Sequence, residues 1–384
     1  MRFEFATAGR IIFGDGTLKE AAPLAAKMGR RALVVAERDS ARALSLLDQM
    51  ESHKLNPFLF SVSGEPTIHM IQEGLFKARE HECDMVVGFG GGSVIDTGKA
   101  IAALLTNPGD IFEYLEVIGK AKPLSALPAP YIAIPTTAGT GAEVTRNAVL
   151  LSPEHKLKVS MRSELMLPRV TIVDPVLTHS LPPDLTASTG LDALTQLIEP
   201  FLSCRANPLT DGICREGIHR AARSLKKAYE DGTDASARED MAIASLFGGL
   251  ALANAGLGAV HGFAGPLGGM FPAPHGVICA RLLPFVMEAN HIALKARDPG
   301  SPILARFDEL AKILTGLSLA TAPDAVSWIK NLCSLFMVPP LSTFGVKESG
   351  IPDIVEKAQN SSSMKANPIQ LTREELEVVL YQSL

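Results

Sequence analysis

The sequence predicts an α/β protein, with an N-terminal Rossmann-like domain built on a parallel sheet and an all-helical C-terminal domain. Short apolar segments alternate with helical patterns up to about Pro183, and such alternation is typical of a doubly wound parallel sheet. Beyond that proline the strand signal disappears and helical periodicity continues. The 384 residues suit about two domains, which we place at residues 1–183 and 184–384.

Five apolar segments are the predicted strands of the first domain. They are residues 31–37, 57–62, 85–90, 131–135 and 170–175. Helical patterns cover residues 16–29, 39–52, 67–81 and 93–106, and in the second domain residues 191–203, 211–231 and 373–384. Ligands in such sheets bind beyond the carboxyl ends of the strands, so we expect a ligand there, facing the helical half across a cleft.

Composition and charge argue against several classes of protein. A formal net charge of −5, with no run of Lys or Arg, disfavours nucleic-acid and acidic membrane partners. The five cysteines are dispersed and form no C-x-x-C motif, which excludes a disulfide scaffold and indicates a reducing compartment. The first residues show no basic start followed by an apolar stretch, so we expect no secretory signal and a cytoplasmic location.

One long uncharged stretch is a candidate for a membrane span. Residues 241–280 contain no Asp, Glu, Lys or Arg, and residues 241–260 are long enough to cross a bilayer. The stretch is rich in Ala and Gly, includes Asn254 and leads directly into His261. We therefore predict a core helix of the helical domain and no membrane association.

A glycine-rich turn at residues 88–100 follows one predicted strand and opens a helix. Backbone N–H groups and the helix dipole at such a turn favour an anion, and three consecutive glycines exceed what a structural turn requires. The turn matches neither common nucleotide fingerprint. Ser93 stands at the last glycine position of G-x-G-x-x-G, and the span from Gly92 to Gly98 is one residue too long for a P-loop. Asp96 would also repel a triphosphate.

Two further segments fit a dinucleotide. The loop at residues 135–149 supplies the hydroxyls of Thr136, Thr137 and Thr140 beside glycines, a composition suited to diphosphate and ribose recognition. Glu37 ends an early strand, where a carboxylate suits a ribose diol and repels a 2′-phosphate, so that NAD is favoured over NADP. The arginine that follows weakens this inference, and a solvated surface glutamate is the alternative.

A metal-type cluster is predicted in the helical half. His261 and His275 are two of only nine histidines and lie in one charge-poor segment, where a buried imidazole needs a partner such as a metal ion. Asp192 and Gln196 are four residues apart and therefore share a helix face. One carboxylate and two imidazoles form a three-ligand site like those of catalytic zinc or iron, and Gln196 adds an amide oxygen. Hydrogen-bonded core residues are the alternative.

These features together resemble the iron-containing (group III) alcohol dehydrogenase family, which shares its fold with glycerol dehydrogenase and dehydroquinate synthase. The resemblance covers essentially the whole chain and is carried by the glycine-serine turn, the PTT-AGTG-E loop and the H-x13-H segment. It implies NAD, with NADP as the alternative, and a divalent metal, Fe²⁺ or Zn²⁺, in a cleft between the two domains. It also implies a small alcohol or aldehyde as substrate and a homo-oligomer, expected to be a dimer.

The resemblance also assigns roles in cofactor binding. The glycine-serine turn holds the pyrophosphate, the threonines line the cofactor, a lysine reaches its ribose and two leucines flank it. With Glu37 and Asp96 included, the predicted cofactor-binding residues are Glu37, Gly91, Gly92, Ser93, Asp96, Thr136, Thr137, Thr140, Lys158, Leu177 and Leu181.

Two departures from the family pattern affect the predicted metal site. The family metal set is Asp, His, His, His, and Gln196 stands where the second ligand is expected. Gly265 stands where the family has a further histidine near the nicotinamide, so the obvious proton relay is absent and space opens beside the reacting carbon. Relatives in the wider superfamily manage with three protein ligands, so Asp192, His261 and His275 are still predicted to bind a metal.

The sequence therefore predicts an NAD(P)-dependent alcohol dehydrogenase or aldehyde reductase, with Asp192, His261 and His275 as catalytic residues that hold a metal polarising the substrate oxygen. A metal-independent NAD(P)H-dependent reductase, along the lines of maleylacetate reductase, is one alternative, because Gln196 replaces a ligand. A dehydroquinate-synthase-like lyase fits less well, since the segment around His261 has no Lys or Arg to hold a phosphorylated acid. A nucleotide-binding protein without catalysis is the last alternative.

Overall fold

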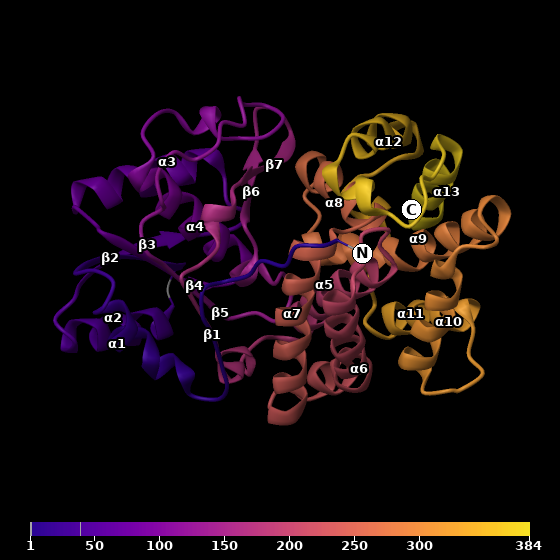
Figure 1. The fold of residues 1–384 in the computed structure, drawn as a ribbon, viewed down its shortest axis with the longest axis horizontal. Helices are drawn as coiled ribbons and strands as arrows, with labels where there is room; N and C mark the ends of the chain where they lie inside the picture. Colours follow the sequence, from indigo (N-terminus) through magenta and orange to yellow (C-terminus); the bar gives the residue numbers. More distant parts are fainter. Residues whose placement is uncertain (1, 39) are drawn as a thin grey trace. The chain divides into compact units, whose positions relative to one another are not determined.

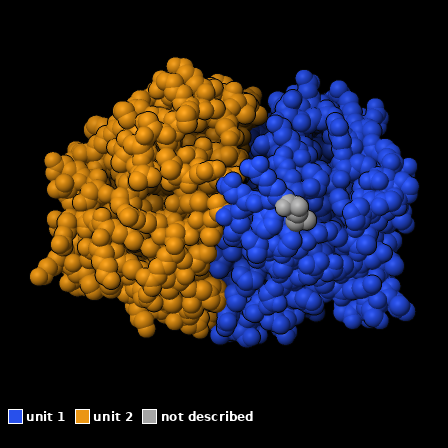
Figure 2. Space-filling view, in the orientation of Figure 1, with its two compact units in different colours: residues 1–5, 138–140, 180–384 blue, residues 6–137, 141–179 orange. Residues whose placement is uncertain are grey.

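The computed structural model describes residues 2–38 and 40–384, which group into two compact units (Figure 2). One, called here the α/β unit, comprises Ala6–Thr137 and Gly141–His179. The other, the helical unit, comprises Ser180–Leu384 with Ala138–Thr140 and a short N-terminal segment that ends at Phe5. Each unit has its own buried apolar core, as expected of a domain.

Within the described residues, six parallel strands form the main sheet of the α/β unit (Figure 1). They are β1 (Ile11–Phe13), β2 (Arg31–Glu37), β3 (Asn56–Val62), β4 (Met85–Gly90), β5 (Tyr131–Pro135) and β8 (Val170–Val173). Their order across the sheet is β1-β8-β5-β4-β2-β3, and all pairs are parallel. The chain runs outward through β2 and β3 and then returns to place β4 beside β2. The predicted α/β class is confirmed.

Helices cover both faces of this sheet. They are α1 (Ala21–Ala25), α2 (Ala41–Ser52), α3 (Ile68–Glu80) and α4 (Gly92–Thr106). Leu33 and Val35 of β2 are buried with residues of α3 and α4, whereas Val34 is buried with residues of α1 and α2. Figure 1 shows the two pairs of helices on opposite sides of the sheet. Because both faces are covered, the strands are continuous apolar runs in the sequence.

Local capping explains where these helices begin. The side chain of Ser40 accepts a hydrogen bond from the N–H of Ala43 at the start of α2, and Thr67 caps α3 in the same way. Helix α4 instead begins after Gly91, which has no side chain to cap it. Asp39, the first residue of the helical pattern predicted at 39–52, lies outside the described residues.

Three strands of the α/β unit were not predicted from the sequence. Strand β1 has three residues, too few to show a period. The antiparallel strands β6 (Asn147–Ser152) and β7 (Leu157–Arg162) form a separate two-stranded sheet, and the first of them overlaps the end of the loop predicted at 135–149. Buried and partly exposed residues alternate along β6, as in a strand with one buried face.

The helical unit contains no strand among its described residues. Its helices are α5 (Pro183–Leu202), α6 (Pro208–Glu230), α7 (Ala235–Ala255), α8 (Ala259–Met270), α9 (His275–Arg297), α10 (Pro302–Thr315), α11 (Ala322–Leu335), α12 (Ile351–Gln359) and α13 (Arg373–Ser383). Helix α5 packs against α6, α7 and α9, and its residues from Gly190 to Leu202 are buried. The all-helical character predicted for this part of the chain is confirmed.

The long uncharged stretch, residues 241–280, includes most of α7, all of α8 and the start of α9. Helix α7 ends at Ala255, Gly256 adopts a positive φ of 73°, and the chain turns by 101° into α8. Helix α9 is long and apolar enough to cross a membrane by length and composition, but 61% of its apolar window is buried inside the protein. Such burial is typical of the core helix of a large helical domain.

Candidate metal centre and cofactor site

Helix α5 carries three buried polar side chains on one face. Asp192, Gln196 and Glu199 follow one another at spacings of four and three residues, which places them on the same side of the helix. Each is at most 6% exposed, although the rest of this face packs in an apolar core. The amide Nε2 of Gln196 donates to Oδ2 of Asp192 at 3.0 Å. Polar groups this deeply buried are stable only with partners.

His261 lies in the first turn of α8 and is held by Glu199. Its Nδ1 lies 2.6 Å from Oε2 of Glu199, and the other carboxylate oxygen accepts the N–H of Val260 at 2.7 Å. Gly258, which precedes the helix, has no side chain, so Glu199 supplies a hydrogen-bond acceptor that the start of α8 needs. With the ring hydrogen on Nδ1, the lone pair of Nε2 is free to bind a metal.

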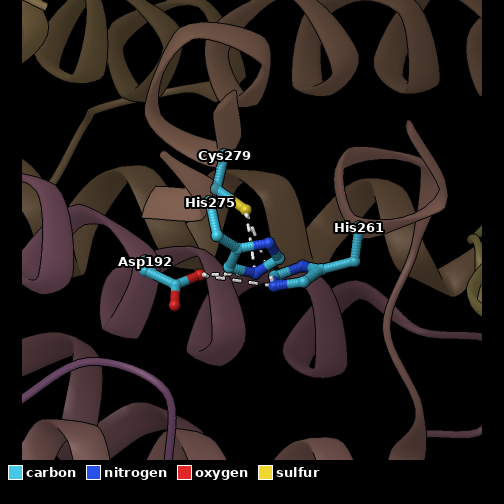
Figure 3. Close-up of side chains that lie close together, drawn as sticks. All are labelled: Asp192, His261, His275 and Cys279. Atoms are coloured by element: carbon cyan, nitrogen blue, oxygen red, sulfur yellow. Dashed lines mark hydrogen bonds and ion pairs between the residues drawn. The ribbon is translucent and has the colours of Figure 1, made fainter. Parts of the chain in front are cut away.

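His275 and Cys279 lie one turn apart on α9. His275 is the first residue of this helix and its side chain is 33% exposed, whereas Cys279 is fully buried. A spacing of four residues places both side chains on the same helix face. Figure 3 shows that both point toward the side chains of Asp192 and His261.

Four side chains from α5, α8 and α9 converge on one point (Figure 3). Oδ1 of Asp192 lies 3.3 Å from Nε2 of His261 and 3.7 Å from Nε2 of His275. Sγ of Cys279 lies 3.7 Å from each of these two nitrogens. All four candidate ligand atoms lie within 4.8 Å of one another. We call this group the metal cluster, because its spacing suits a tetrahedral divalent cation.

The electrostatics of the metal cluster favour a cation. Burial raises the pKa of Asp192, but the neighbouring His275 and His261 imidazoles outweigh it and lower the pKa below its usual range. Oδ1 of Asp192 is buried, and no well-aligned hydrogen-bond donor reaches it from the described residues. Burial raises the pKa of the Cys279 thiol to about 12, against the opposing effect of His261. A buried, ionised carboxylate oxygen without a donor is an attractive position for a metal ion.

The two departures from the family pattern lie next to the metal cluster. Gln196 contacts Asp192 through its N–H, and its Oε1 is buried without a hydrogen-bond partner in the described part of the chain. This oxygen lies 3.6 Å from the position that a Cβ would take on Gly248 of α7. Gly265, one turn after His261, borders open space, because a Cβ there would meet no atom within 4 Å.

The carboxyl ends of β2, β4 and β5 bring three predicted cofactor residues together. The strand order reverses between β2 and β4, which is where doubly wound sheets bind ligands. Glu37 ends β2, Gly91 follows β4 and Thr137 follows β5. Oε1 of Glu37 and Oγ1 of Thr137 both lie 3.6 Å from the position that a Cβ would take on Gly91. The missing side chain of Gly91 therefore leaves room between them.

Helix α4 begins at this position. Gly91 is its N-cap, and Gly92 and Ser93 are its first two residues, both partly exposed. The first N–H groups of a helix have no partner within it, and the helix dipole is positive there. This arrangement is the one expected of a pyrophosphate site.

Two predicted cofactor residues are engaged with other protein groups. Oδ2 of Asp96 accepts the N–H of Val149 at 2.9 Å, and Oδ1 lies 3.7 Å from Nζ of Lys99. Lys158 pairs with Oε1 of Glu65 at 2.8 Å. Burial raises the pKa of Asp96 to about 6, against the opposing charge of Lys99. A ribose would have to compete with these contacts.

The other predicted cofactor contacts differ in their exposure. Thr136 and Thr137 are partly exposed directly after β5, and Thr140 is partly exposed in the short segment grouped with the helical unit. Leu177 is buried in a turn that follows β8, and Leu181 is partly exposed just before α5. Their roles stay predictions.

Two residues of the metal cluster and its surroundings are missing from the sequence prediction. Cys279 follows His275 by four residues, and Glu199 follows Asp192 by seven. Helical periodicity counted from the predicted ligands is the signal that finds both of them. Without that count, a lone cysteine in an apolar segment is indistinguishable from a core residue.

Two family models match nearly the whole chain. Residues 8–175 match the model described as iron-containing alcohol dehydrogenase, and residues 186–384 match the model described as the C-terminal part of the Fe-containing alcohol dehydrogenase family. The two matches therefore cover both units.

Curated relatives extend over most of the chain. Alcohol dehydrogenase 4 of Saccharomyces cerevisiae is 36% identical over 375 residues, which cover 96% of this chain and 95% of the relative. The 1,3-propanediol dehydrogenase of Klebsiella pneumoniae is 38% identical over 328 residues, covering 84% of this chain and 81% of the relative.

Solved structures share the fold. A crystal structure of a 1,3-propanediol oxidoreductase superposes with a TM-score of 0.92 at 34% identity and covers the whole of both chains. Sulfoacetaldehyde reductase from Bifidobacterium kashiwanohense, solved in complex with NAD⁺, has a TM-score of 0.87 at 28% identity, covering 100% of this chain and 99% of that chain. On these matches, the chain belongs to the iron-containing alcohol dehydrogenase family and is an oxidoreductase of that type.

Proposed function

We propose that this protein is an NAD-dependent enzyme that interconverts a small alcohol and the corresponding aldehyde or ketone, assisted by a divalent metal at Asp192, His261 and His275. The observation that carries this proposal is the convergence of these three side chains, with imidazole nitrogens 3.3 and 3.7 Å from one buried carboxylate oxygen. Relatives named alcohol dehydrogenase and 1,3-propanediol dehydrogenase support a small alcohol as the substrate.

NAD is the proposed cofactor. Gly91, Gly92 and Ser93 are placed to receive the pyrophosphate at the start of α4, where the helix N–H groups are unpaired within the helix. Glu37 lies next to Gly91, and its carboxylate suits a ribose diol while repelling the 2′-phosphate of NADP. The related sulfoacetaldehyde reductase, solved with NAD⁺, supports the same choice.

The donor set fits a divalent metal, Fe²⁺ or Zn²⁺. When bound, the ion would act as a Lewis acid that polarises the substrate oxygen, while the nicotinamide gives or takes the hydride. Asp192 contributes the negative charge that balances the cation among apolar helices. Glu199 fixes the ring of His261 so that Nε2 faces the metal cluster. His275 is the most exposed member, so substrate is expected to approach on its side.

The proton of the alcohol must leave by a route that does not use residue 265. Gly265 has no side chain and borders open space, where the family has a histidine. The same space accommodates a bulkier substrate than a histidine would allow. The proposal is therefore an alcohol dehydrogenase whose proton transfer differs from the pattern of its family.

We further propose that the enzyme is a cytoplasmic homodimer that binds neither nucleic acid nor membranes. The net charge of −5 without a basic cluster and the burial of α9 inside the protein support the part of this proposal that concerns nucleic acid and membranes. Light scattering on a size-exclusion column tests the dimer, since a mass near that of one chain contradicts it.

Chelator dialysis followed by readdition of Fe²⁺ or Zn²⁺ tests the metal. Alcohols and aldehydes are assayed with NAD⁺, NADH and NADPH before and after treatment. We expect turnover to be lost on chelation and restored by one of the metals. Rates that chelation leaves unchanged would favour a metal-independent reductase. NADH binding without turnover on any substrate would favour a non-catalytic nucleotide-binding protein.

A further inference from the structure

Cys279 lies in the metal cluster although the proposed function gives it no role. We propose that its Sγ is a fourth protein ligand, which releases its proton to solvent as the metal binds, so that a thiolate supplies the donor that the family takes from a histidine. The complete donor set is then Asp192, His261, His275 and Cys279. The inference rests on the proposed function, because it requires a metal at this position.

The distances between the donor atoms match a tetrahedral site. With metal–nitrogen and metal–oxygen bonds of about 2.0 Å and a metal–sulfur bond of about 2.3 Å, tetrahedral angles place nitrogen and oxygen donors about 3.3 Å apart, and sulfur about 3.5 Å from nitrogen. The structure has 3.3 Å between Oδ1 of Asp192 and Nε2 of His261, and a longer 3.7 Å between the same oxygen and Nε2 of His275. It has 3.7 Å between Cys279 and each imidazole nitrogen. These separations are therefore compatible with one ion bound by the sulfur, the carboxylate oxygen and both imidazole nitrogens.

Gln196 is less well placed to be the fourth ligand. Its N–H is already donated to Oδ2 of Asp192, whereas the imidazoles face Oδ1 of the same carboxylate. Reversing the amide would bring its oxygen against Oδ2, and two acceptors without a hydrogen between them repel. Gln196 thus donates to the carboxylate oxygen that does not face the imidazoles, whereas the sulfur of Cys279 lies close to both imidazole nitrogens.

A thiolate donor changes which metal the site prefers. Sulfur ligands favour zinc over ions that prefer oxygen and nitrogen donors, and zinc sites commonly combine cysteine with histidine. Cys279 is fully buried, and α9 holds it one turn from His275, so little rearrangement is needed to bind. The structure therefore favours Zn²⁺ over Fe²⁺ for this chain.

Cobalt substitution detects the metal–sulfur bond directly. The whole protein is stripped with a chelator and titrated with Co²⁺, because a cobalt–thiolate bond produces a charge-transfer band in the near ultraviolet. X-ray absorption of the Zn²⁺-loaded wild type gives a second readout, with sulfur scattering expected at about 2.3 Å. Neither measurement depends on turnover, and the second needs no variant.

The variants are Cys279→Ser and Cys214→Ser. Cys214 is equally buried in the same unit but lies outside the metal cluster, so it controls for a hydroxyl replacing a buried thiol. We expect Cys279→Ser to lose the cobalt band and to bind Zn²⁺ at least about tenfold more weakly. Tenfold is the lower end of the loss of metal affinity on changing a residue that hydrogen-bonds to a ligand, and the loss of a ligand itself should cost no less. Cys214→Ser keeps both the band and the affinity.

The outcomes separate the two proposals. Wild-type protein that takes up Co²⁺ and Zn²⁺ without a thiolate band or sulfur scattering would overturn the role of Cys279 and leave the proposed function standing. A band that survives in Cys279→Ser would overturn it as well. Wild-type protein that binds neither metal would contradict both this inference and the metal in the proposed function.

Discussion

The Glu199 carboxylate joins the N-terminus of α8 to the imidazole of His261. One of its oxygens accepts the N–H of Val260 at 2.7 Å, and the other lies 2.6 Å from Nδ1 of His261. A single buried side chain thus both caps a helix and sets which nitrogen of the histidine faces the metal cluster.

Replacing Glu199 with Gln is expected to weaken metal binding by about 10–100-fold, the usual effect of changing a partner of a ligating histidine. An amide has one acceptor oxygen and cannot accept both hydrogen bonds that the carboxylate accepts. A titration of Zn²⁺ against a competing chelator measures the change. Glu288→Gln is the control, because Glu288 forms a half-exposed ion pair with Lys330. Equal affinities in both variants would show that Glu199 does not act through His261.

Replacing His275 with Ala is expected to abolish turnover while NADH binding is retained. Loss of Lewis-acid assistance costs several kcal/mol, which corresponds to a fall of kcat by about 10²–10³-fold or more. NADH fluorescence titration and steady-state assays measure the two properties separately. His219→Ala, an exposed substitution on α6, is expected to change neither. Full activity in His275→Ala would argue against the metal role.

Replacing Gly91 with Ala is expected to weaken NADH binding about tenfold or more, about 1.4 kcal/mol, with little effect on stability. The added Cβ would lie 3.4 Å from Cγ2 of Thr137, which the fold tolerates, but it would fill the space in front of α4. Calorimetric NADH titration and thermal unfolding test this. Gly300→Ala is the control, because it adds the same methyl group where no atom lies within 4 Å, and it is expected to leave NADH binding unchanged. Unaltered NADH affinity would place the pyrophosphate elsewhere.

Replacing Glu37 with Gln is expected to raise the use of NADPH relative to NADH. Two unit charges a few ångströms apart interact by about 1 kcal/mol even in water, so the ratio of kcat/KM values should move about fivefold or more. Glu51→Gln, on the exposed surface of α2, is expected to leave the ratio unchanged. If both variants behave alike, Glu37 does not contact the ribose.

Glu143 makes stability depend on pH. It is buried, and burial raises its pKa from 4.5 to about 7. The folded chain therefore holds this proton over a pH range in which the unfolded chain has lost it, and the free energy of unfolding falls as the pH rises through that window. Glu143→Gln removes this loss, worth up to ~3 kcal/mol.

Urea unfolding at about pH 5 and about pH 8 measures this effect, since each unit of pKa shift is worth about 1.4 kcal/mol. We expect the wild type to lose more stability between the two conditions than Glu143→Gln. Parallel losses in both proteins would assign the pH dependence to other groups.

The central strands of the sheet were predictable because burial on both faces makes them almost entirely apolar. The segments at 31–37, 85–90 and 131–135 coincide with β2, β4 and β5. Strand β1 and the β6–β7 pair were not predictable in this way. The first is three residues long, and the start of β6 lies within the Thr- and Gly-rich segment that is predicted as a loop, whereas the apolar and polar residues that alternate along β7 are a strand signal that the prediction did not use.

The metal cluster was predictable only in part. Histidine is rare in this chain, so His261 and His275 stand out, and Asp192 follows from the family pattern. Cysteine is common in apolar cores, so Cys279 stands out only when helical periodicity is counted from His275, and the three helices then place it beside the other ligands. The contacts of Asp96 and Lys158 with protein partners depend on side chains distant in sequence, which no local pattern contains.

Helix α5 fixes the spacing of Asp192, Gln196 and Glu199 by its rise and turn alone. Inserting one residue between the first and the last would rotate Glu199 by about 100° around the helix axis and advance it by about 1.5 Å. The N–H of Val260 at the start of α8 would lose its hydrogen-bond acceptor, and the ring of His261 would lose the carboxylate that orients it. This stretch of the chain is therefore expected to accept changes of side chain far more readily than changes of length.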